Sequence, residues 1–111
     1  MLASKYKLKT RTHFARTEID GVLIQSKSFG LSFYSRGDGL NSKFAVVVST
    51  KISKKAVERN RIRRMFFQII SKNLEKFKQD FDYIFLVKHF AAAQTTKSLE
   101  DEINNILTKV V

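Results

Sequence analysis

Six consecutive residues concentrate the most distinctive chemistry of this sequence: Arg59-Asn60-Arg61-Ile62-Arg63-Arg64. A guanidinium is planar, always charged and able to bind phosphate through two donors, and an asparagine amide can both donate to and accept from a base edge or a ribose. Three lysines precede this arginine run (residues 59–64), namely Lys51, Lys54 and Lys55. Residues 51–64 therefore carry seven basic and one acidic side chain, a pattern typical of a surface that binds a nucleic-acid backbone.

A second basic segment lies at the start of the chain, where residues 1–16 carry five cations and no acid. These cations are Lys5, Lys7, Lys9, Arg11 and Arg16. The two segments contribute +5 and +6, which is the whole formal net charge of +11. A surplus concentrated in this way creates a directed field that attracts a polyanion, although solvated faces or mobile ends are an alternative explanation.

Other kinds of chemistry find little support among the residues. Cysteine is absent, which excludes disulfides, thiolate metal sites and cysteine nucleophiles. His13 and His89 are isolated, and no serine has a histidine and an aspartate at usable spacing. We therefore expect neither a catalytic residue nor a metal site in the protein itself.

Hydropathy argues against a membrane protein. The apolar stretch over residues 83–93 is interrupted by Lys88 and His89 and is too short to cross a bilayer. The basic N-terminus lacks the apolar core of a secretory signal. The length of 111 residues predicts a single domain, residues 1–111. Without cysteine, a membrane span or a secretory signal in the sequence, the expected location is the cytoplasm.

Periodicity predicts the elements that must position the arginine run. Helices are expected at residues 10–18, 56–78 and 96–110, and strands at residues 22–25, 28–34, 44–49 and 82–87. The turn-rich residues 35–42 suggest an antiparallel hairpin, and the apolar run after them suggests a central strand. The last helix starts either with a capping box of Ser98 and Asp101 or earlier, at Thr95 or Thr96. This α-β-β-β-α-β-α order predicts an α+β two-layer sandwich with a mostly antiparallel sheet.

The helix expected at residues 56–78 has two distinct faces. Its apolar positions form a stripe with the helical period. These positions are Ile62, Met65, Phe66, Ile69, Ile70, Leu74 and Phe77. At about 100° per residue, Asn60, Arg61 and Arg64 fall opposite the stripe, while Arg59 and Arg63 flank it. Phe67 leaves the stripe and is expected either to pack under another element or to contact a partner. Cations in a first helical turn oppose the helix dipole, and such a local violation suggests a functional site.

The arginine run and its surroundings resemble the bacterial ribonuclease P protein family. The similarity includes residues 45–51, the linker residues 53–58 and the helix that follows. It extends upstream to Lys7-Leu8-Lys9, Phe14, Gly21 and Phe29, and downstream to Phe81-Asp82-Tyr83-Ile84. The resemblance therefore covers nearly the whole chain.

Membership of that family would imply a protein that binds a catalytic RNA and the 5′ leader of precursor tRNA. The RNA would supply the active site and bind most of the Mg²⁺, and no obligate protein partner is expected. The residues that would bind RNA are Lys51, Lys54, Lys55, Arg59, Asn60, Arg61, Arg63 and Arg64. Additional basic contacts would come from Lys5, Lys7, Lys9 and Arg11. The resemblance also implies a left-handed βαβ crossover and a leader cleft at Phe14, Phe33 and Tyr34, with Glu18 and Ser32 where the family often has aromatics.

Two other functions fit part of the pattern. A structural RNA-binding protein, such as a ribosomal protein, explains the basic segments equally well but does not require the arginine run on one helix end. A sequence-specific DNA-binding helix is weaker, because no second short helix precedes the basic one at helix-turn-helix spacing.

Overall fold

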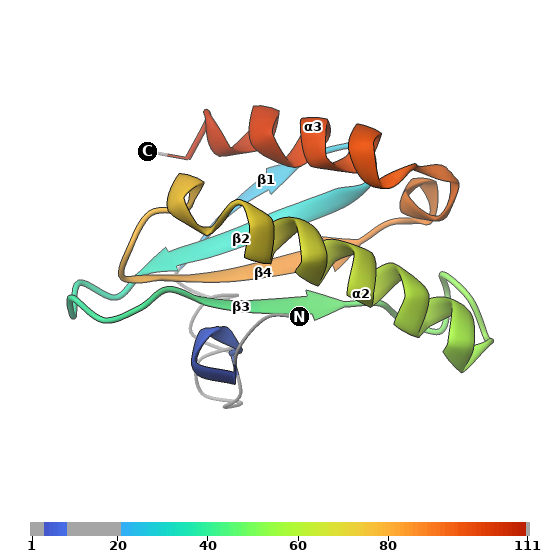
Figure 1. The fold of residues 1–111 in the computed structure, drawn as a ribbon, viewed down its shortest axis with the longest axis horizontal. Coiled ribbons are helices and arrows are strands. Elements are labelled where there is room, and N and C mark those ends of the chain that lie inside the picture. Colours follow the sequence, from blue (N-terminus) through green and yellow to red (C-terminus); the bar gives the residue numbers. More distant parts are fainter. Residues whose placement is uncertain (1–3, 9–20, 111) are drawn as a thin grey trace.

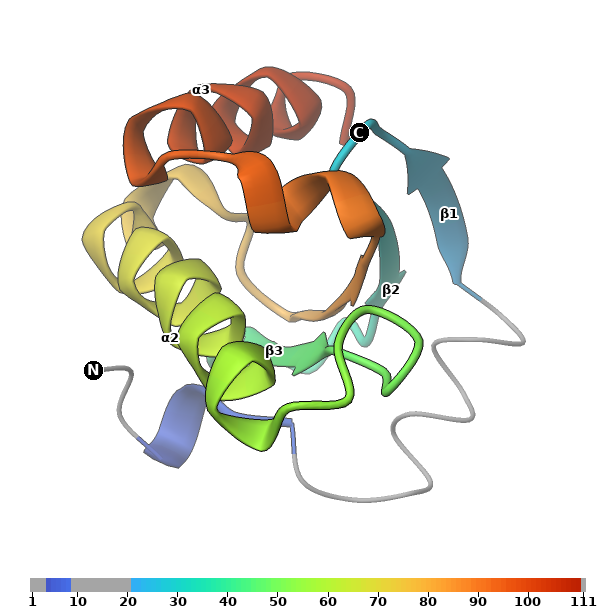
Figure 2. The ribbon, with the colours of Figure 1, turned by 90° about the vertical axis from the view of Figure 1, so that its right-hand side faces the viewer.

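The computed structural model describes residues 4–8 and 21–110, whose arrangement is shown in Figure 1. Four strands form one sheet: β1 (Val22–Gln25), β2 (Phe29–Ser35), β3 (Lys43–Val47) and β4 (Phe81–Val87). Helices α2 (Ala56–Lys72) and α3 (Thr96–Leu107) lie on one face of the sheet (Figure 2). Short 3-10 turns occupy Ser4–Tyr6, Leu74–Lys76 and His89–Ala93. The predicted α+β class is confirmed, and the helix expected at residues 10–18 lies outside the described residues.

The strand order corrects the predicted hairpin. The order is β1-β2-β4-β3, so β4 separates β2 from β3; β4 runs antiparallel to β2 and parallel to β3. Tyr83, Ile84 and Phe85 are completely buried, so β4 is apolar on both faces and occupies the centre of the sheet. The expected central position of residues 44–49 is therefore wrong, because β3 lies at the edge.

The connection between β2 and β3 passes the start of β4 and is held there by Arg36. The guanidinium of Arg36, only 6% exposed, forms an ion pair with the fully buried Asp82 of β4 and another with Asp38 at 2.8 Å. It also donates to the carbonyl of Asn41 at 2.6 Å. The glycines of this turn-rich segment do have left-handed backbones, but they form a wide connection instead of a tight hairpin turn.

Helix α2 connects the parallel strands β3 and β4, forming a βαβ unit whose left-handedness stays a prediction from the resemblance.

The outer edge of β3 pairs with the N-terminal segment: Lys7 forms a parallel bridge with Phe44, and the Leu8 amide donates to the Phe44 carbonyl at 2.8 Å. This pairing fixes the position of Lys7 relative to the helix layer.

Helix α2 ends at Lys72, six residues before the predicted end. The side-chain amide of Asn73 donates to the Ile69 carbonyl at 2.7 Å and to Glu100 of α3 at 2.9 Å. An asparagine that bonds nearby carbonyls competes with the helix, and here it terminates it. The apolar stripe continues beyond this point, because the next turn directs Phe77 into the core.

The core lies between the sheet and the two helices and is rich in aromatic rings. Phe44 stacks on Tyr83 at 5.3 Å between centroids, and Phe66 contacts both Phe29 and Phe85 at less than 6 Å. Buried aromatic pairs of this kind each add about 0.5–1.5 kcal/mol beyond the area they remove from water. This core holds the inner face of α2 rigidly, so its outer side chains have defined positions.

Helix α3 is fixed to the sheet by one carboxylate. Glu102 accepts hydrogen bonds from Ser28 in the β1–β2 turn and from Gln94, both at 2.8–2.9 Å, and from Ser26. The helix begins with a capping box of Thr95 and Ser98, which confirms the earlier of the two predicted starts.

Candidate nucleic-acid interface

The first turns of α2 and the loop before them form one braced unit. Arg59 donates to the Ser53 carbonyl at 2.9 Å, and the Ser53 hydroxyl accepts from the Lys55 amide at 3.2 Å. Lys51, Lys54 and Lys55 are all exposed on this loop. Arg59 is thus partly structural: it holds the lysine-bearing loop against the start of the helix.

The arginine run divides as the helical period predicts. Ile62 is completely buried in the core, whereas Asn60, Arg61 and Arg64 are exposed and Arg59 and Arg63 are partly buried at the margin. The buried face anchors the helix, so the charged face cannot turn inward. The predicted segregation of core and cation faces is confirmed.

Internal contacts organise the arginine run without neutralising it. Arg61 pairs with Glu58 at 2.6 Å, and this hydrogen bond holds the pKa of the Glu58 carboxyl below its usual range and raises the pKa of Arg61. Arg63 donates to the Asn60 amide oxygen at 2.7 Å. Within residues 4–8 and 21–110, the Arg64 guanidinium has no ion-pair or hydrogen-bond partner. The local charge therefore stays strongly positive, with Arg64 the most available donor.

The fold joins the two basic segments. The ammonium of Lys7 lies 5.3 Å from the centroid of the Phe67 ring, and both residues line a depression of about 450 Å³ beside α2. The other residues of this α2 groove are Val57, Asn60, Arg63 and Arg64. Lys7 and Phe67 each stand out in the sequence separately, but no local signal pairs residues this far apart in the chain. Val57 was missed, although its place beside the arginine run was a usable signal.

The other predicted N-terminal contacts divide between described and undescribed residues. Lys5 is exposed and lies 5.1 Å from the ring of its neighbour Tyr6. Lys9, Arg11 and Phe14 lie outside the described residues, as does Glu18. Only Lys5 and Lys7 can therefore be placed relative to α2.

The predicted leader cleft needs a correction at Phe33. Its side chain is 6% exposed and packs against Phe81 and Tyr83 at 6.1 and 6.3 Å between centroids. Strand alternation places Phe33 on the same face as Phe29 and Leu31, which is the face covered by the helices. Phe33 is a core residue, while Tyr34 points to the opposite face and is partly buried.

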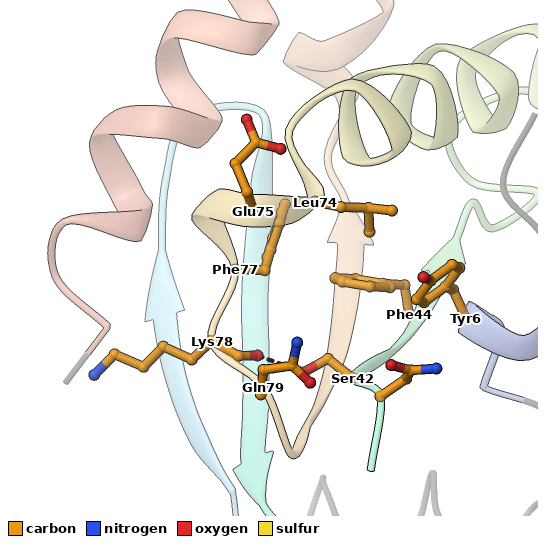
Figure 3. A pocket seen from close by; sticks show the side chains of 9 residues that line it. Tyr6, Ser42, Phe44, Leu74, Glu75, Phe77, Lys78 and Gln79 are labelled. Carbon is orange, nitrogen blue, oxygen red and sulfur yellow. Dashed lines mark hydrogen bonds between the residues drawn. The ribbon is translucent and has the colours of Figure 1, made fainter. Parts of the chain in front are cut away.

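A second depression, of about 160 Å³, lies near the C-terminal end of α2 (Figure 3). Tyr6, Phe44 and Phe77 form its aromatic part, and the Ser42 hydroxyl donates to the Lys78 carbonyl at its base. Among the described residues that line it, Glu75 and Lys78 are the charged ones, and their charges are opposite. This depression therefore lacks the positive field of the α2 groove.

The part of the chain that the structure describes, residues 4–8 and 21–110, contains neither a metal-binding cluster nor a membrane-spanning helix. No group of three or more His, Cys, Asp or Glu side chains there is arranged to hold a metal ion. None of the helices in the same part of the chain has the length and hydropathy needed to cross a membrane.

Comparison with known proteins distinguishes between the RNA-binding interpretations. The Ribonuclease P family model matches residues 2–111. The ribonuclease P protein component of Pseudanabaena sp. is 28% identical over 109 residues, covering 98% of this chain and 94% of the relative. The ribonuclease P protein component of Synechococcus elongatus is 33% identical over 108 residues, covering 94% of this chain and 88% of the relative.

Solved structures show the same fold. The ribonuclease P protein from Thermotoga maritima superimposes with a TM-score of 0.84 at 21% identity, covering 95% of this chain and 97% of that one. The ribonuclease P protein from Staphylococcus aureus superimposes with a TM-score of 0.82 at 20% identity, and the superposition covers 93% of each chain. Because the family model spans almost the whole sequence, the chain belongs to the ribonuclease P family, as the protein component of this ribonucleoprotein endoribonuclease.

Proposed function

We propose that the arginine run and Lys7 bind the phosphate backbone of the catalytic ribonuclease P RNA. In this role the chain also contacts the 5′ leader of precursor tRNA and assists endonucleolytic removal of that leader, in the cytoplasm. One observation carries the proposal: the core fixes one face of α2, and the opposite face presents cations that are joined by a lysine from the N-terminal segment.

The electrostatics of α2 support phosphate binding. Glu58 is the one acid in the first turn of α2, and its charge is offset by Arg61. Lys55 occupies the N-cap and makes no side-chain capping bond. The first amides of an α-helix lack acceptors within the helix, so an uncapped start surrounded by cations favours an anion. Lys51, Lys54 and Lys55 extend this positive surface onto the preceding loop.

In this proposal the protein supplies binding and positioning, whereas the RNA supplies the catalytic groups. Mg²⁺ prefers carboxylate and water ligands in an octahedral arrangement. The arginine run and the adjacent Glu58 do not fit such a site, because the Glu58 carboxylate accepts from Arg61 and the Asn60 amide oxygen accepts from Arg63. We accordingly assign Mg²⁺ mainly to the RNA and derive no step through it.

Reconstitution with ribonuclease P RNA and precursor tRNA tests the function directly. At low Mg²⁺ concentration, adding the full chain should raise the rate of leader removal, and the chain without RNA should cleave nothing. Absence of stimulation, or cleavage by the protein alone, would contradict the proposal. Stronger binding to ribosomal RNA fragments than to ribonuclease P RNA in direct competition would do so as well.

A further inference from the structure

The α2 groove combines apolar and cationic side chains in a way that phosphate binding does not explain. Phe67 and Val57 form its apolar part, and Val57 is 79% exposed although it lies next to the most charged turn of the protein. A site for backbone phosphates alone needs donors and has no use for an aromatic ring. The apolar part therefore indicates contact with another portion of the ligand.

Phe67 is the aromatic residue of α2 that reaches this groove. Phe66, its neighbour in sequence, is completely buried between Phe29 and Phe85, whereas Phe67 lies at the edge of the core and lines the surface depression. Its inner edge packs on the core, so the ring is held in place. A fixed ring at a surface is a suitable platform for a flat apolar ligand.

The charges around the ring identify the ligand class. Lys7, Arg63 and Arg64 line the groove together with the Asn60 amide, and none of its lining residues in the described part of the chain is acidic. An aromatic platform within such a positive groove matches a nucleotide, whose base stacks while its phosphate pairs with the cations. In a duplex both faces of each base are already covered by neighbouring bases, so only an unpaired nucleotide can use the ring.

We propose that the α2 groove binds one unpaired RNA nucleotide, with its base stacked on Phe67 and its phosphate on Arg64 and Lys7. This inference rests on the proposed function, in which the same face binds RNA. The ammonium of Lys7 lies 5.3 Å from the centroid of the Phe67 ring, in the space where the base would stack. A cation–π contact at an accessible site is weaker than base–aromatic stacking, so the base displaces the ammonium, which remains available for the phosphate.

Phe67→Leu tests the stacking contact, because leucine keeps an apolar side chain against the core and removes the ring. Binding of a single-stranded oligouridylate of about ten nucleotides should weaken by about 5-fold to 150-fold, the range for loss of one stacked base. Binding of a blunt-ended RNA duplex, which has no unpaired nucleotide, should match that of the wild type, and so should the salt dependence of binding to both RNAs. Unchanged affinity for the single strand, or an equal loss for the duplex, would overturn the proposal.

Phe67→Trp provides a second, direct readout, because the chain contains no tryptophan. Its fluorescence should be quenched by the oligouridylate and unaffected by the duplex. Leu40→Trp is the matched control, since Leu40 is exposed in the β2–β3 connection, at the opposite end of the molecule from the start of α2 (Figure 1). Equal quenching of both tryptophans, or of neither, would exclude specific stacking at position 67.

The source of the nucleotide follows from three further titrations of the Phe67→Trp protein. Quenching by ribonuclease P RNA alone places the nucleotide in the RNA subunit. Quenching that requires precursor tRNA and is absent with mature tRNA places it in the leader, and quenching in neither case overturns the inference. If the wild-type protein binds ribonuclease P RNA while position 67 stays silent, only this inference fails; if the wild type does not bind, the proposed function fails.

Discussion

Arg61 and Arg64 lie on the same exposed face of α2 but differ in what they already contact. Arg61 is paired with Glu58 at 2.6 Å, whereas the Arg64 guanidinium has no partner among the described residues. Both should contact RNA phosphates under the proposed function. We predict that Arg64→Ala and Arg61→Ala each weaken binding to ribonuclease P RNA, and that Arg64→Ala has the larger effect on salt dependence.

The magnitude follows from counterion release. Each phosphate contact contributes about 0.7 to 0.9 to the slope of log affinity against log salt concentration. Losing one contact should therefore make the ratio of wild-type to Arg64→Ala affinity fall by about 2.6-fold to 3.5-fold between roughly 50 and 200 mM salt. Arg61→Ala should change the slope less, because Glu58 already offsets part of the Arg61 charge. Glu58→Gln should have the opposite effect and steepen the slope.

The assay is equilibrium binding of the full chain to ribonuclease P RNA over a series of salt concentrations. Lys72→Ala is the matched control: it removes one positive charge from the same helix, at an exposed position in the last turn. Its slope should equal that of the wild type, because the position lies outside the arginine run. Thermal unfolding of each variant checks that the helix is intact.

Two results would refute this reasoning. If neither arginine variant changes the slope, these side chains do not contact phosphates, and the RNA binds elsewhere. If Lys72→Ala changes the slope as much as Arg64→Ala does, the protein responds to net charge and not to the position of the arginines.

The remaining predictions concern stability. Arg36→Met should lower the free energy of unfolding in urea by about 3–5 kcal/mol, because it leaves the buried Asp82 without its ion pair, and adding Asp82→Leu should restore most of the loss. Burial alone would raise the pKa of Glu102, but hydrogen bonds from the β1–β2 turn and Gln94 lower it below its ordinary value of 4.5. The melting temperature should therefore fall as the pH drops below 4.5, and Glu102→Gln should make this fall less steep. Burial also raises the pKa of Tyr83 to about 12, so stability should decline as the pH rises above 10, where the unfolded tyrosine ionises, and Tyr83→Phe should flatten that decline.

Much of the candidate interface could be predicted from the sequence because its pattern is local. Which residues share a face of α2 depends only on the helical period, so the burial of Ile62 and the exposure of Arg64 followed from their spacing. The concentration of charge in two segments was likewise visible without a fold. The length of α2 was harder to predict from the sequence, because Asn73 ends the helix partly through a hydrogen bond to Glu100, a residue of another helix.

The sheet order depended on contacts between distant residues. A continuous apolar run indicates a buried strand but not its neighbours, so β3 and β4 could not be ranked by their sequences. β4 lies at the centre of the sheet because both of its faces are covered, and β3 lies at the edge, where Lys7 pairs with Phe44.

The sequence by itself determined that this protein carries a helix with a core face and a cationic face, because side-chain direction along a helix is a local property. Only the tertiary structure decided what lies beside that helix. Edge pairing with β3 carries Lys7 to Phe67 and makes a groove from two basic segments. Such proximity arises from long-range packing and strand pairing, which leave no periodic signature in the chain.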